Sequence, residues 1–227
     1  MAYNYQECEE YVRNIMQRIP VLRIKQLARA LYKLCPTITS TTEAMLTLNK
    51  IQRKGYIFMS PDGFAITRGA YSVATGDRLL TKVNSKIGEF AIPDMGPLLQ
   101  EKRLLTSATD CFWIACDFLP YSYEFIANLT PPWSVCFDAK SSDGLTKVYE
   151  VAKVKKGEGY QTAEILKSVP PVPDEAKSGI IRVAILEDIK EKDILPAVGF
   201  KFLCTIDENK PRGYKVIEKR EGSQIWG

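Results

Sequence analysis

A four-residue turn between two short apolar segments is the feature that most restricts the fold of this chain. Residues 60–63 are Ser-Pro-Asp-Gly, and they separate the largely apolar residues 56–59 from residues 64–67. Proline presets φ for a turn, aspartate hydrogen-bonds the nearby backbone, and glycine accepts positive φ. The pattern therefore predicts a β-hairpin over residues 56–67.

Three helical patterns precede this hairpin. Apolar residues recur at helical spacing within residues 5–19, 24–34 and 44–51. Ser40 and Glu43 have the spacing of a capping box, in which Ser40 is the N-cap and the Glu43 side chain bonds back to the Ser40 backbone. Gly55 closes the third helix. We therefore expect three helices followed by two strands.

Three helices followed by a hairpin is the order of a winged helix-turn-helix, and residues 22–68 resemble that family throughout. Residues 48–57 are similar to the passage from recognition helix into wing. The resemblance implies that the third helix enters the DNA major groove and that the wing contacts backbone or minor groove. The residues it offers for binding DNA are Thr41, Thr42, Thr47, Asn49, Lys50, Arg53, Lys54 and Arg68.

Charge is distributed unevenly along the chain. Residues 1–90 contain 13 basic and 7 acidic side chains, whereas residues 91–227 contain 18 basic and 20 acidic ones. A basic N-terminal part favours a polyanion, here double-stranded DNA, as its partner. A protein–protein interaction module is the alternative, because winged helices serve that role too. Further basic side chains on the second helix are either phosphate contacts or solvated surface: Arg23, Lys25, Arg29 and Lys33.

The C-terminal part alternates between helical and strand patterns. Helices are predicted over residues 106–119, 160–168 and 189–195, and strands over residues 133–138, 147–154, 180–186, 201–206 and 214–218. This order indicates a small α/β domain with a mixed central sheet. We expect an α+β or α/β chain divided into a winged helix over 1–72, a linker or dimerisation arm over 73–95, and the α/β domain over 96–222.

The C-terminal order resembles the restriction-endonuclease-like core. Together with a winged helix, it resembles winged-helix proteins of bacterial mobile elements related to the replication-relaxation family, with a degenerate restriction-endonuclease-like domain. The best-matching phrases are residues 110–115, 132–135, 149–154 and 182–185. The resemblance implies a DNA-binding role in replication or transcription control of a plasmid, conjugative or other element, with a replication or conjugation protein as a further partner.

A metal-dependent nuclease is the other hypothesis that this resemblance raises. Its candidates are Asp138, Glu150 and Lys153, but the last two are spaced as Glu-x-x-Lys and not as Glu-x-Lys. Side chains alternate faces along a strand, so Lys153 is expected to lie on the opposite face from Glu150, and Ala152 occupies the position of the lysine. A bulge would restore the geometry. The run Lys153, Lys155 and Lys156 is interpreted as a solvated strand end in preference to a phosphate contact.

Composition excludes several classes of enzyme. The chain has no histidine, which removes Ser-His-Asp and Cys-His nucleophiles and imidazole metal ligands. The six cysteines form no Cys-x-x-Cys pair and are expected to be reduced thiols in a cytoplasmic protein without signal peptide or membrane span. We predict a DNA-binding homodimer with no catalytic residue, no metal site and no cofactor.

Overall fold

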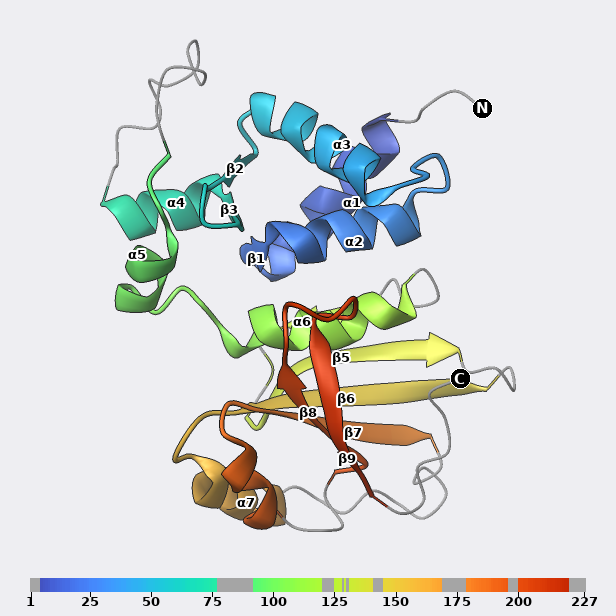
Figure 1. Cartoon of the computed structure of the whole chain (residues 1–227), viewed down its shortest axis with the longest axis vertical. Helices are drawn as coiled ribbons and strands as arrows, with labels where there is room; N and C mark the ends of the chain where they lie inside the picture. Colours follow the sequence, from blue (N-terminus) through green and yellow to red (C-terminus); the bar gives the residue numbers. More distant parts are fainter. Residues whose placement is uncertain are drawn as a thin grey trace. The chain divides into compact units, whose positions relative to one another are not determined.

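The computed structural model describes residues 5–76, 92–119, 125–127, 129, 131–140, 145–168, 179–195 and 200–220. The chain divides into two compact units, Met1–Thr109 and Asp110–Gly227. Figure 1 shows the elements of both units, and each unit is described by itself. The predicted linker or arm, residues 73–95, falls largely on residues 77–91, which lie outside the described residues.

Three helices form the first part of unit 1, and all three were predicted. They are α1 (Tyr5–Arg18), α2 (Ile24–Leu34) and α3 (Thr41–Arg53). Each buries the apolar stripe that its sequence spacing indicates. Val12 of α1, Leu31 of α2 and Leu48 of α3 are fully buried, so the three helices share one core.

Unit 1 also contains a three-stranded antiparallel sheet. It consists of β1 (Val21–Arg23), β2 (Ile57–Met59) and β3 (Phe64–Thr67), in the order β1-β3-β2. The hairpin prediction is confirmed: the Ser60 amide donates to the Phe64 carbonyl at 2.8 Å across the predicted turn. Strand β1 was not predicted, because three residues after Pro20 are too short to show an alternating pattern.

Two further helices, α4 (Arg68–Thr75) and α5 (Gly96–Glu101), belong to unit 1. Helix α4 runs across residue 72, where the sequence analysis placed the end of the first domain. Leu99 of α5 is fully buried against a cluster that includes Val21 and Ile66 of the small sheet. This packing joins residues beyond 95 to the N-terminal unit, and the division between the units falls after Thr109.

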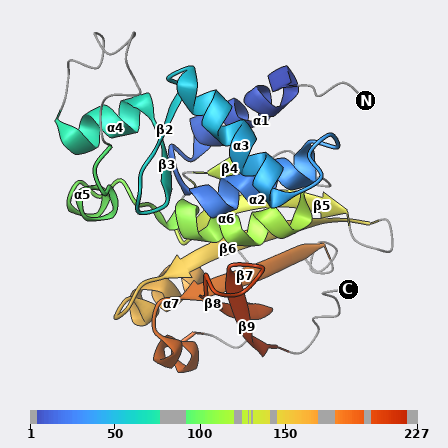
Figure 2. The same ribbon diagram turned by 45° about the horizontal axis from the view of Figure 1, so that its top comes forward.

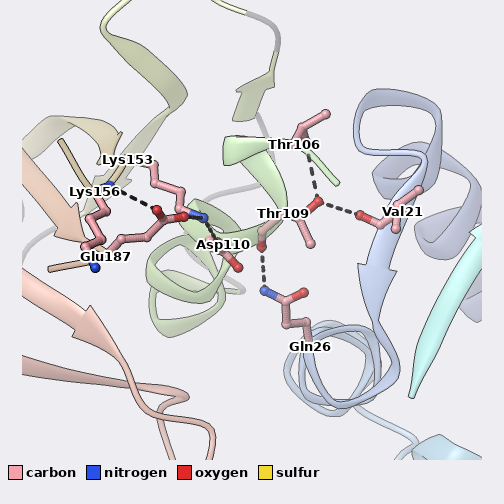
Figure 3. A network of polar contacts seen from close by, with 8 residues as sticks. All are labelled: Val21, Gln26, Thr106, Thr109, Asp110, Lys153, Lys156 and Glu187. Carbon is pink, nitrogen blue, oxygen red and sulfur yellow. Dashed lines mark hydrogen bonds and ion pairs between the residues drawn. The ribbon is translucent and has the colours of Figure 1, made fainter. Parts of the chain in front are cut away.

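The last residue of unit 1, Thr109, is anchored by two hydrogen bonds within that unit. Its hydroxyl donates to the Val21 carbonyl at 2.9 Å, and its carbonyl accepts from the Gln26 amide at 2.7 Å (Figure 3). Gln26 is fully buried. These bonds satisfy polar groups that would otherwise be costly to bury.

Unit 2 is built on a six-stranded mixed sheet whose strands follow each other in chain order. The strands are β4 (Phe125–Ala127), β5 (Trp133–Lys140), β6 (Thr146–Val154), β7 (Ile180–Leu186), β8 (Phe202–Ile206) and β9 (Tyr214–Lys219). Strands β6, β7 and β8 pair in parallel, and the other pairs are antiparallel. The prediction of helices with a mixed sheet is confirmed; strand β4 was missed.

Helices cover both faces of this sheet, as the two views in Figures 1 and 2 show. Helix α6 (Ser107–Phe118) packs on one face, where the centres of the Phe118 and Tyr149 rings are 4.3 Å apart. Helix α7 (Gly159–Ser168) packs on the other, where Leu166 joins a buried cluster with Ala152 and Val154. The short 3-10 helix η2 (Ile189–Asp193) follows β7.

Burial on both faces was expected for the apolar strand β7, and residues 183–186 are indeed buried without interruption. All six cysteines are free thiols. Among the described residues, no helix has both the length and the apolar composition needed to cross a membrane.

Candidate nucleic-acid interface

The start of α3 is fixed by side-chain hydrogen bonds. The Ser40 hydroxyl accepts from the Glu43 amide at 3.1 Å, as a capping box requires. The Glu43 carboxylate, however, accepts from the backbone amide and the hydroxyl of Thr39, at 2.8 and 3.0 Å. The predicted reciprocal bond therefore forms one residue earlier than Ser40, and it also ties the preceding loop to the helix.

One side of α3 is buried and the opposite side is exposed. Ala44, Leu48 and Ile51 are fully buried. The side turned to solvent carries exposed residues three and four positions apart, which places them in one row along the helix. This row, called here the α3 face, consists of Thr42, Leu46, Asn49, Lys50 and Arg53, with Thr41 exposed at its beginning.

The α3 face includes one residue that the sequence analysis missed. Leu46 is 58% exposed, although it lies in a row of polar side chains. The signal was present in the sequence, because Leu46 is four residues from Thr42 and three from Asn49 and so shares their side of a helix. The DNA contacts expected from the sequence were polar and basic side chains, and Leu46 is apolar.

Thr47 was expected on the exposed face of the third helix, and that expectation is wrong. Its side chain is only 1% exposed, and its hydroxyl donates to the Glu43 carbonyl at 2.8 Å. Thr47 lies three residues after Ala44 and four before Ile51, so the helical period places it on the buried side. A threonine there satisfies its hydroxyl within its own helix and has no surface to offer to DNA.

Lys54, another predicted DNA contact, is engaged within the protein. Its ammonium pairs with the Glu9 carboxylate of α1 and lies 4.5 Å from the centre of the Tyr5 ring. The hydrogen bonds from Lys54 and then from Arg13 lower the pKa of Glu9 below its usual value. A phosphate at this point would have to compete with a carboxylate that is already bound.

The remaining basic candidates lie at the start of α4 and on or just before α2. Arg68 is the first residue of α4, directly after β3, and is half-buried. On and before α2, Lys25 is exposed, Arg29 and Lys33 are half-buried, and the Arg23 guanidinium lies 5.3 Å from the centre of the Phe64 ring. The structure therefore leaves Lys50 and Arg53 as the predicted basic residues that stand exposed on the α3 face.

Asp138 and Glu150, the carboxylates of the nuclease hypothesis, lie on one face of the large sheet. Glu150 of β6 pairs in register with Cys136 of β5, two residues from Asp138. The Glu150 carboxylate accepts from the Arg182 guanidinium at 2.8 Å, and both side chains are largely buried. Asp138 is exposed.

Lys153 lies on the opposite face, as strand parity predicted. Strand β6 pairs with β7 in unbroken register from Val148 to Val154. Its pairing with β5 shifts register between Trp133 and Val135, so the extra residue belongs to β5 and does not turn Lys153. Its ammonium bonds Asp110 of α6 at 2.5 Å and Glu187 at 2.7 Å (Figure 3). Burial alone would lower the pKa of Lys153, but the two carboxylates raise it overall. The three nuclease candidates therefore do not converge on one point.

The basic run at the end of β6 is divided by the fold. Lys153 is 14% exposed in its ion pairs, whereas Lys155 and Lys156 are exposed. The Lys156 amide donates to the Glu187 carboxylate at 3.0 Å. The three lysines therefore do not form a single cationic surface for phosphates.

No protein-family model, no curated protein and no solved structure matches the chain. The α3 face of unit 1 is the candidate site that the geometry and the charge of the chain favour together.

Proposed function

We propose that unit 1 is a winged helix-turn-helix that binds double-stranded DNA through the α3 face. The observation that carries the proposal is the row of exposed polar and basic side chains opposite the buried side of α3. The hairpin β2–β3 supports it, because it follows α3 directly in the chain, as the wing of such a domain would. The basic excess within residues 1–90 supplies attraction to phosphates.

The polar and basic residues of the α3 face have side chains suited to groups on DNA. Lys50 and Arg53 suit phosphate oxygens or guanine edges, because their donors are charged and reach outward. Asn49 suits the N6 and N7 positions of adenine. Thr42 suits a phosphate at the N-terminal end of the helix. Together they allow one helix to hold the backbone and to contact bases.

We propose that unit 2 is a restriction-endonuclease-like core that acts without catalysis. Its sequentially ordered mixed sheet with helices on both faces supports this proposal. Non-catalytic action is supported by the divergence of Lys153 from Glu150 and by the ion pair that Glu150 makes with Arg182. Unit 2 would then dimerise the protein or recruit a replication or conjugation protein. The biological role proposed for the whole chain is control of replication or transcription of a mobile element.

The exposed Leu46 favours a second candidate function, a protein-binding surface on α3. An apolar side chain amid polar neighbours is common at the centre of protein interfaces. The two functions differ in their response to salt, because DNA binding releases counterions and weakens steeply as salt rises.

Fluorescence anisotropy with a labelled random-sequence duplex tests the proposal on the full-length protein. We expect the wild type to bind at low salt. Arg53→Ala should lose about 1–3 kcal/mol of binding free energy if the Arg53 side chain reaches a base edge. Lys167→Ala is the matched control, since Lys167 is an exposed lysine of α7 in unit 2 that forms an ion pair with its neighbour Glu164. Equal affinities for Arg53→Ala, Lys50→Ala and Lys167→Ala would contradict the assignment of the α3 face.

A dimer is the proposed working unit, because one winged helix covers a short site and pairing doubles the phosphate contacts. Light scattering at the concentrations of the binding assay measures this directly. A monomer that binds DNA with a single-site stoichiometry would contradict the dimer and leave the α3 face unaffected.

A further inference from the structure

We infer that Leu46 is a specificity-determining residue that contacts the C5-methyl group of thymine, so that the α3 face selects A·T base pairs; this inference rests on the proposed function. Leu46 is 58% exposed on a helix whose buried side is already filled by Ala44, Leu48 and Ile51. No role in the core of unit 1 therefore remains for it to fill.

The position of Leu46 within the α3 face, and not its exposure alone, supports a contact with a base. Single exposed apolar side chains are common on protein surfaces. Leu46, however, lies between Thr42 and Asn49 along the row of DNA-facing candidates. In the major groove the thymine methyl is the apolar group that a base edge presents, and apolar side chains are its partners.

The neighbour Asn49 makes the assignment more specific. Asparagine bonds adenine through N6 and N7, so Asn49 also favours an A·T pair. Side chains three residues apart on a helix are separated by about 5–6 Å, and successive base pairs by about 3.4 Å. The pair contacted by Leu46 is therefore expected one or two base pairs from the pair contacted by Asn49.

If Leu46 contacts this methyl group, the methyl group makes a measurable contribution to DNA-binding affinity. Burying a methyl group on Leu46 changes affinity by about fourfold. Deoxyuridine differs from thymidine only by lacking this methyl group, and it preserves base pairing. Replacement of one thymidine by deoxyuridine therefore isolates the contact.

The experiment begins with selection of bound sequences by the full-length protein from a pool of random-sequence duplexes. We expect a thymine preference that Leu46→Ala removes, one or two positions from an adenine preference that Asn49→Ala removes. The selected duplex is then synthesised with deoxyuridine at that thymine. The wild type should bind it about fourfold more weakly, and Leu46→Ala should bind both duplexes equally.

Leu145→Ala is the matched control, because Leu145 is an equally apolar side chain, 63% exposed, in unit 2. It should keep the full discrimination between the two duplexes. Binding of DNA without a methyl effect, or with a methyl effect that persists in Leu46→Ala, overturns this inference and leaves the proposed function standing. Absence of DNA binding by the wild type overturns both.

Discussion

Substitution of Gly213 by alanine tests how closely the turn before β9 is packed against α6. A Cβ at Gly213 would lie 2.3 Å from Cδ2 and 2.4 Å from Cε3 of Trp113. Trp113 is 3% exposed, so its indole has little room to move. Gly213 also has a φ of 77°, which costs an alanine about 1–2 kcal/mol.

The two costs can be separated with a matched variant. Gly157 has a φ of 82°, and a Cβ there would meet no atom within 4 Å. Gly157→Ala should therefore lower the free energy of unfolding only by the cost of a positive φ, about 1–2 kcal/mol. Gly213→Ala should lower the free energy of unfolding by a further ~1–3 kcal/mol, because overpacking a filled core has costs of that size.

Urea unfolding followed by circular dichroism measures both variants against the wild type. We expect the wild type to have the highest free energy of unfolding, Gly157→Ala a lower one and Gly213→Ala the lowest. If Gly213→Ala is no less stable than Gly157→Ala, the turn and Trp113 do not pack as described, and the reasoning is refuted.

Three further predictions concern Thr47, Lys153 and Glu187. Thr47→Val should lower stability by about 0.5–1.5 kcal/mol through loss of the bond to the Glu43 carbonyl, with DNA affinity in anisotropy unchanged. Lys153→Met should lower the unfolding free energy in urea by up to about 3 kcal/mol, because Asp110 and Glu187 lose their shared cation; an unchanged midpoint would contradict this ion-pair network. Burial would raise the pKa of Glu187, but bonds from Lys153 and the Lys156 amide lower it overall; its stabilisation is therefore present above the unfolded-state pKa of about 4.3 and is lost as pH falls through the lower folded value. Thermal unfolding between about pH 5 and pH 3 should show a steeper loss for the wild type than for Glu187→Gln, and parallel curves would contradict the assignment.

Local sequence signals predicted most of the helices and strands of this fold. Helices α1 to α3 and the β2–β3 hairpin follow from apolar spacing, the Ser40 cap and the turn at residues 60–63, all of which act within a few residues. Strands β1 and β4 have three residues each, too few for a period-two pattern. Helix α4 was missed for a related reason, since eight residues give only two turns of spacing.

The site was predicted less completely, because burial and pairing depend on distant residues. The opposite directions of Glu150 and Lys153 followed from strand parity alone. The partners of Lys153, however, lie 43 residues before it and 34 after it, at Asp110 and Glu187. The carboxylate that engages Lys54 is Glu9, 45 residues away, and no local pattern indicates it.

A photo-crosslinking amino acid placed at position 49 tests the central claim, that the α3 face contacts DNA, most directly. The full-length protein carrying it is irradiated with a labelled random-sequence duplex at low salt, and the control carries the crosslinker at Gln17, an exposed position on α1. The account predicts a DNA adduct from position 49 that disappears as salt rises, and little or none from position 17. Equal adducts from the two positions, or none from position 49 while the protein remains bound, would contradict it.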